Sequence, residues 1–148
     1  MIPVYQTQND SVYGDCFRAC VASIMEFNIE VMPNFWNQTQ DVEEFWRLVD
    51  EWLGNHSFTA FHIEPFLKPK DLICIAFFNK VNETGGHAVV WRNGIIHDPS
   101  KIELDLEEEP TLFTILVYLH PENLFKRKER GNKKIIEYAK NIKRKVYF

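Results

Sequence analysis

The sequence predicts an α+β fold, because helical spacing dominates its first third and short apolar strands dominate the part that follows. Residues 16–27 place apolar side chains three and four positions apart, which is typical of a buried helix. Residues 41–53 repeat that spacing with acidic side chains on the opposite face, which indicates a second, amphipathic helix ending at Gly54-Asn55. Helices first and strands afterwards favour helices packed on an antiparallel sheet.

Five segments are predicted as strands. Residues 72–78 form a continuous apolar run, which is typical of a central strand. Residues 87–91 and 95–97 flank Asn93-Gly94, a pair that tolerates the positive φ angles of a tight hairpin. The remaining two strands are expected at residues 57–63 and 112–119.

The size and composition of the chain are those of one domain with a substantial core. It has 148 residues, of which 45% are hydrophobic and 14% aromatic. Its three cysteines, an odd number with no Cys-x-x-Cys pair, argue against a disulfide framework and a zinc ribbon. We therefore expect no metal and no other cofactor. With no signal-peptide pattern and no apolar run near the ~20 residues of a membrane span, the chain is expected to be cytoplasmic.

Charge divides the chain into two parts, predicted as a domain at 1–123 and a basic helical tail at 124–148. Residues 126–145 contain ten Lys/Arg and two Glu, whereas the other residues contain seven basic and nineteen acidic side chains. The tail can dock on the domain through its apolar stripe, or it can contact an anionic partner such as nucleic acid, lipid or an acidic protein. The oligomeric state stays open, with a monomer favoured.

Cys16 is the candidate nucleophile among the three cysteines. It opens the first predicted helix, directly after Asp15, a candidate N-cap. A helix N-terminus favours the thiolate, which is the reactive form of cysteine. Cys20 lies one turn further along the apolar face and Cys74 lies inside a strand, so both are interpreted as structural. The alternative for Cys16 is a small buried apolar residue.

His87 and Asp98 are the candidate partners of that thiol. His87 follows two glycines at the start of a strand, and the Asn93-Gly94 hairpin returns the chain beside it. We expect His87 to lie near the level of His97 and Asp98, within reach of the carboxylate. The alternative is that His87 and Asp98 merely end two strands. The other histidines, at positions 56, 62, 97 and 120, have no metal-ligand spacing and are interpreted as surface or packing residues.

Three motifs together resemble those of papain-like cysteine peptidases. They are Gly-Asp-Cys-Phe-Arg-Ala-Cys-Val-Ala-Ser-Ile at 14–24, Gly-Gly-His-Ala-Val-Val-Trp at 85–91 and His-Asp-Pro-Ser at 97–100. The likeness extends over about residues 5–120 and is greatest to short microbial and phage-encoded members, and to peptidases that trim bacteriocin leaders or cell-wall peptides.

The resemblance implies a papain-like fold and a role for each residue of the motifs. Cys16 would be the nucleophile, His87 the general base and then acid, and Asp98 the residue that orients His87. An oxyanion hole would combine the Cys16 backbone N–H with a glutamine amide, for which Gln6 is preferred and Gln8 is the alternative. The family often has this glutamine closer to the cysteine.

The expected function is hydrolysis of a peptide, isopeptide or other amide bond, in the host cytoplasm if the chain is phage-encoded. The alternative is a catalytically inactive papain-like binding protein, for example a phage-type effector that contacts a host partner. A third class, nucleic-acid binding through the tail, would show steep salt dependence.

Overall fold

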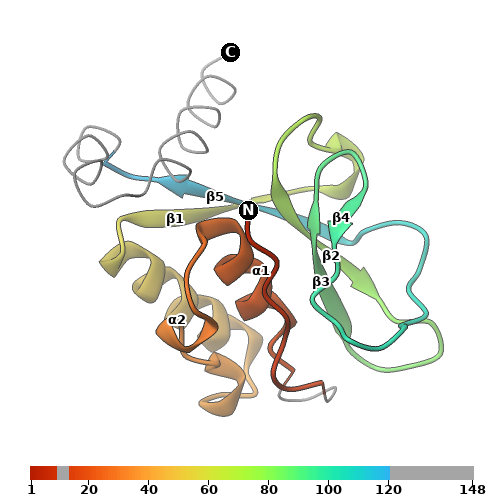
Figure 1. Ribbon diagram of the computed structural model, residues 1–148, viewed down its shortest axis with the longest axis horizontal. Helices are drawn as coiled ribbons and strands as arrows, with labels where there is room; N and C mark the ends of the chain where they lie inside the picture. The colour runs from red at the N-terminus through yellow and green to blue at the C-terminus, as the bar shows by residue number, and fades with distance from the viewer. Residues whose placement is uncertain (10–13, 121–148) are drawn as a thin grey trace.

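An antiparallel sheet forms the centre of the fold (Figure 1). The structure is a computed structural model that describes residues 1–9 and 14–120. Within these residues the sheet has five strands, in the order β1-β5-β2-β3-β4. The strands are β1 (Phe58–Ile63), β2 (Cys74–Asn79), β3 (Gly86–Trp91), β4 (Ile95–His97) and β5 (Leu112–Tyr118). Every neighbouring pair is antiparallel, which confirms the α+β prediction.

Two α-helices precede the sheet in the described part of the chain: α1 (Cys16–Met25) and α2 (Val42–Asn55). Helix α1 ends two residues before the predicted limit, because Glu26 adopts a left-handed conformation with φ 57°. Helix α2 begins after Asp41, whose carboxylate accepts the N–H of Glu44 at 2.8 Å. It continues through Gly54 and Asn55, where the sequence predicted its end. Short 3₁₀ turns complete the helical segments: η1 (Ile29–Val31), η2 (Phe35–Asn37) and η3 (Pro65–Leu67).

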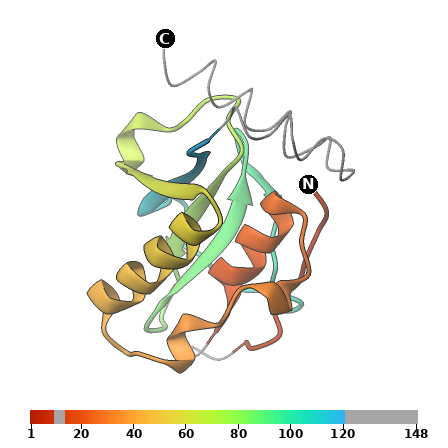
Figure 2. The same ribbon diagram turned by 90° about the vertical axis from the view of Figure 1, so that its left-hand side faces the viewer.

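Both α-helices cover the same face of the sheet (Figures 1 and 2). Helix α1 packs mainly on β3, and α2 packs mainly on β1. The core between them includes Val21 and Leu53 from the helices and Ile75, Val90 and Leu116 from the sheet, all fully buried. Burial of this apolar surface is the main favourable contribution to folding.

The opposite face of the central strands is also buried. Cys74, Ala76 and Phe78 of β2 belong to a second apolar cluster with Val89 and Phe113. A strand that is buried on both faces has no polar alternation. This explains the continuous apolar run that predicted a central strand at 72–78.

The β3–β4 hairpin turns at Asn93 and Gly94, which have φ angles of 60° and 151°. His97 pairs with Val90, so His87 lies three residues beyond that pair along β3. The expectation that His87 lies level with His97 and Asp98 is therefore wrong in register. Any contact between His87 and Asp98 must be diagonal.

The predicted basic tail at 124–148 and the domain boundary at 123 lie outside the described residues. No helix in the part of the chain that is described has the length and apolar character needed to cross a membrane.

Replacement of Leu53 by Ala is expected to lower the free energy of unfolding by about 2–5 kcal/mol. The Leu53 side chain is fully buried between α2 and the sheet, so its truncation leaves a cavity. Urea unfolding followed by tryptophan fluorescence measures the change.

Val42→Ala is the matched control, because Val42 lies on the same helix with 59% of its surface exposed. It is expected to change the free energy by no more than about 0.5 kcal/mol. Equal effects of the two substitutions would contradict the packing of α2 described above.

Candidate active site

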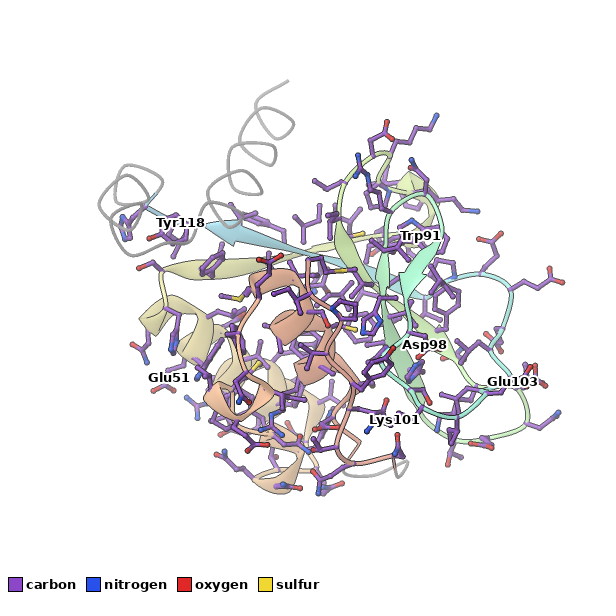
Figure 3. The ribbon with its side chains drawn as sticks, viewed as in Figure 1. Glu51, Trp91, Asp98, Lys101, Glu103 and Tyr118 are labelled. Carbon is purple, nitrogen blue, oxygen red and sulfur yellow. The ribbon has the colours of Figure 1, made fainter. Side chains whose placement is uncertain are left out.

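A thiol, an imidazole and a carboxylate from three separate segments meet beside the start of α1. Cys16 is the first residue of α1, His87 is the second residue of β3, and Asp98 directly follows β4. His87 Nε2 lies 2.7 Å from Asp98 Oδ1. The Cys16 side chain is near enough to the His87 ring to raise its pKa, and Cys16 Sγ accepts the backbone N–H of Ala88, the next residue. The structure thus brings together the three residues that the sequence singled out, and Figure 3 shows Asp98 beside strands β3 and β4.

The position of Cys16 is set by contacts with β3. Its Sγ accepts the backbone N–H of Ala88 at 3.4 Å. One turn further along α1, the Cys20 thiol donates to the carbonyl oxygen of the same residue, also at 3.4 Å. Two cysteines four residues apart therefore hold the two polar backbone groups of Ala88, the residue after His87. This places the helix start directly beside the imidazole.

The three cysteines differ in burial. All are free thiols, but Cys20 and Cys74 are fully buried whereas Cys16 is partly exposed and lines a cleft. Burial raises the pKa of Cys20 well above its usual value, with the nearby Cys16 and Asp98 charges adding to the effect. Burial also raises the pKa of Cys74, to about 12. Both buried thiols therefore stay protonated near neutral pH, as their interpretation as structural residues requires.

The environment of His87 favours its protonated form. Burial of the ring lowers the pKa of His87, but hydrogen bonds to Asp98 and Cys16 and the charges of both groups outweigh it and raise the value to about 9. Because Nε2 donates to Asp98, Nδ1 is the ring atom available to the thiol. His87 can therefore accept and hold a proton from Cys16.

Asp98 is itself held in place. Burial raises the pKa of Asp98. The hydrogen bonds from the His87 ring and from the Ser100 N–H outweigh burial, together with the charges of His87 and His97, so that the pKa of Asp98 is lowered overall. The Ser100 N–H donates to Asp98 Oδ1 at 2.8 Å. The carboxylate is thus ionised and oriented toward the imidazole.

The structure separates the two candidate glutamines. Gln6 is 5% exposed, lines the cleft with Cys16, and donates from Nε2 to the Gln8 carbonyl at 2.8 Å. Its backbone N–H donates to the carbonyl of Pro99 at 3.0 Å, which ties it to the segment carrying Asp98. The Gln8 side chain instead accepts from the amide of Asn34 at 2.5 Å, and Gln8 is not among the residues that line the cleft.

Asp15 has a different role from the one predicted. It occupies the N-cap position, but its side chain makes no capping hydrogen bond. The carboxylate accepts the backbone N–H groups of Thr7 and Gln8, both at 2.9 Å, and forms an ion pair with Arg18 at 3.2 Å. The prediction of a side-chain cap is therefore wrong, because the long-range partners at residues 7 and 8 take the oxygens.

Asp15 and Arg18 position the segment that carries Gln6. Asp15 is 1% exposed and Arg18 is 9% exposed, so their charges compensate each other in a buried place. Arg18 Nε also donates to the carbonyls of Ile29 and Met32, at 3.0 and 2.5 Å. This ion pair was not predicted. Its signal in the sequence is an acid and an arginine three residues apart at the start of an apolar helix.

Two hollows meet at Cys16. One is a cleft of about 390 Å³, and the other is a hollow of about 270 Å³ walled by Phe17, Phe45, Trp46 and Phe77. Cys16, Trp36 and Gly86 line both, so the two hollows adjoin at the residue that carries the thiol. The cleft is further lined by Gln6, Asn9, Gly14, Gln40, Val42, Lys80, Gly85, His87, Ser100, Ile102 and Leu104.

The two glycines before His87 are required by the backbone at the start of β3. Gly85 has φ 98°, a conformation that is strained for residues with a side chain. A Cβ atom on Gly86 would lie 3.3 Å from the carbonyl oxygen of Phe78. The absence of side chains therefore serves the turn and the close approach of β3 to β2.

The other histidines with assigned contacts lie in structural positions. His97 bonds the Val4 carbonyl, His62 bonds the Thr114 hydroxyl, and His56 bonds the Trp52 carbonyl, at 2.7–2.9 Å. Within residues 1–9 and 14–120, no three His, Cys, Asp or Glu side chains are grouped so as to hold a metal ion.

Comparison of the chain with protein-family models, with curated protein sequences and with solved structures finds no match. The chemistry of the cleft is therefore inferred from its own residues and geometry.

Replacement of Asp98 by Asn is expected to lower the pKa of His87 from about 9, because the amide carries no charge while burial still favours the neutral ring. The raised pKa contributes stability that is fully present below the usual histidine value of about 6.5 and is lost as the pH rises through about 9. The difference in unfolding free energy between wild type and Asp98→Asn should therefore shrink over that interval, by roughly 1–3 kcal/mol.

NMR titration of the histidine rings and urea unfolding at several pH values measure these two effects. His62, whose pKa is lowered mainly by burial, is the internal control and should titrate alike in both proteins. A His87 pKa that stays near 9 in the Asn variant would show that Asp98 does not sustain it.

Proposed function

We propose that this chain is a cysteine hydrolase with a papain-like fold that cleaves a peptide, isopeptide or other amide bond. The observation that carries the proposal is the Cys16–His87–Asp98 arrangement beside a cleft of about 390 Å³. A thiol hydrolase requires a base within reach of the sulfur and a third group that fixes the imidazole, and these three side chains fit those roles.

In the first half of the reaction His87 Nδ1 takes the thiol proton and the Cys16 sulfur attacks the carbonyl carbon. As the C–S bond forms, the carbonyl electron pair moves to oxygen. Protonated His87 then gives its proton to the departing nitrogen as the C–N bond breaks, which leaves a thioester on Cys16. Water, deprotonated by His87, attacks the thioester and releases the acid and the thiol.

Asp98 keeps the imidazole in the tautomer and orientation that this sequence of steps needs. It accepts Nε2–H at 2.7 Å, so the free electron pair of the neutral ring lies on Nδ1, toward the thiol. The raised pKa of His87 stabilises the imidazolium that forms when the ring takes the thiol proton.

Gln6 is the residue we propose for the oxyanion hole, together with the backbone N–H of Cys16. A glutamine amide has two N–H groups, and the Gln8 carbonyl uses one of them. The same bond fixes which end of the amide is nitrogen. The second N–H is therefore the donor that we assign to the developing negative oxygen.

The arrangement of elements also supports the papain-like assignment. The cysteine opens a helix that packs on an antiparallel sheet, the histidine lies on a strand of that sheet, and the aspartate follows the next strand. A catalytically inactive binding protein on the same fold, such as a phage-type effector with a host partner, is the competing hypothesis. The cytoplasmic location and an anionic partner for residues 124–148 are further proposals from the sequence.

At pH 6, iodoacetamide is expected to alkylate Cys16 about tenfold or more faster than a free cysteine peptide, because His87 holds the displaced proton. His87→Ala should remove that advantage and should lower hydrolysis of a cleavable peptide from a library by about 10²–10⁴-fold. Mass spectrometry locates the modified cysteine and gives its rate.

His56→Ala is the matched control, because His56 stacks on Trp52 at the end of α2. This substitution should leave the alkylation rate and the hydrolysis rate unchanged. If wild-type Cys16 is alkylated no faster than a free thiol, the hypothesis of a catalytically inactive binding protein is favoured.

Gln6→Ala is expected to lower the hydrolysis rate by about 10²–10³-fold, because it removes one donor to the oxyanion. Alkylation by iodoacetamide forms no oxyanion, so its rate should change less than about twofold. Comparison of the two rates in one variant separates loss of the donor from general damage to the site.

Gln38→Ala removes an exposed amide from the end of η2 and should leave both rates as in wild type. Equal losses of hydrolysis and alkylation in Gln6→Ala would contradict the oxyanion role and would indicate a displaced Cys16.

A further inference from the structure

A lysine lies in the wall of the cleft that contains Cys16 and His87. Lys80 directly follows β2, and its side chain is only 11% exposed. Its backbone is fixed on both sides, since its N–H donates to Gly85 and it bridges to Leu106. The Lys80 side chain therefore belongs to a structured wall and is mostly buried.

The ion pair that this ammonium makes is weak. Its carboxylate is that of Glu83, with Nζ and Oε2 separated by 3.5 Å and the Glu83 side chain 63% exposed. An exposed carboxylate at that distance is screened by water and contributes little. Withdrawal of an ammonium from water is unfavourable unless an anion compensates it. Glu83 can be displaced at low cost by a better placed anion.

The rest of the cleft is suited to the same kind of group. Among the described residues that line it, the other polar side chains are neutral amides and a hydroxyl, and none is Asp or Glu. The positive charge of His87 is already paired with Asp98, 2.7 Å away. An anion in this cleft would therefore meet the Lys80 ammonium and no carboxylate among the described residues that line it.

The hollow on the other side of Cys16 has the opposite character. Its walls include six aromatic side chains, among them Trp36 and Phe45, whose rings stack with centroids 4.1 Å apart. Such walls favour an apolar group. The two sides of the sulfur therefore select for different chemistry.

We propose that Lys80 binds a carboxylate of the substrate, so that the enzyme cleaves amide bonds with a carboxylate on the Lys80 side and an apolar group on the aromatic side. The inference rests on the proposed hydrolase function. The carboxylate can belong to an acidic side chain or to the end of a peptide chain, and the chemistry recognised is the same.

The direct test compares two alkylating reagents on Cys16. Iodoacetate and iodoacetamide have nearly the same shape, and the sulfur displaces iodide from both, but only iodoacetate carries a negative charge. Lys80→Met should lower the ratio of the iodoacetate rate to the iodoacetamide rate by about fivefold. Lys80→Arg retains the charge and should keep the ratio within about twofold of wild type.

Lys70→Met is the matched control, since Lys70 is exposed and does not line the cleft. It should leave the ratio unchanged. If circular dichroism shows that the Met variant is unfolded, Lys80→Gln is measured in its place and read in the same way. A ratio within twofold of wild type in the folded, uncharged variant overturns the proposal.

The ratio distinguishes this proposal from the proposed function. Both reagents modify any accessible thiol, so the ratio is measurable whether or not the protein hydrolyses amides. Failure of the hydrolase proposal would appear instead as equal alkylation of wild type and His87→Ala.

A second arm uses cleavable peptides in matched pairs. One pair exchanges Glu for Gln beside the cleaved bond, and the other exchanges a free carboxyl terminus for an amide. Wild type should show a higher kcat/KM for the charged member of one pair, which identifies the source of the carboxylate, and Lys80→Met should lose that preference. Equal kcat/KM values within both pairs in wild type overturn the proposal.

Discussion

The site depends on one packing constraint, which is the register between helix α1 and strand β3. Cys16 accepts the N–H of Ala88 and Cys20 donates to its carbonyl, both at 3.4 Å. Because residues four apart lie on the same face of a helix, the side chains of Cys16 and Cys20 can reach the N–H and the carbonyl of a single strand residue. Because His87 precedes Ala88, this register alone brings the sulfur to the imidazole, and a helix shifted by one residue would separate them.

A second constraint holds the other wall of the cleft. The buried Asp15–Arg18 pair joins the first turn of α1 to residues 7 and 8, and Gln6 lies at the end of that connection. Loss of one member would leave a buried charge without its partner, which is strongly destabilising. Asp15 and Arg18, which resemble ordinary helix-start residues in the sequence, thus help to position Gln6, the proposed oxyanion donor. A second contact also positions Gln6, because its backbone N–H donates to the carbonyl of Pro99.

Electrostatics and shape give the two sides of Cys16 different preferences. The imidazole is stabilised in its charged form by Asp98 and Cys16, although it is almost fully buried. Lys80 adds positive charge on the cleft side, whereas the other hollow is lined by aromatic rings. The walls of the two hollows therefore differ in charge and polarity, and the proposed direction of substrate binding rests on this difference.

Local patterns in the sequence were sufficient for the elements and for singling out Cys16, His87 and Asp98, which the structure brings together. The three-and-four spacing before Met25, the apolar run at 72–78 and the Asn93-Gly94 turn depend on near neighbours, and so does the position of Cys16 at a helix start. The contacts of Asp15, the diagonal reach of Asp98 and the different positions of Gln6 and Gln8 depend on partners far along the chain. Only the tertiary structure decided these, because packing and long-range hydrogen bonds determine where a side chain points, whereas periodicity determines only the face it occupies.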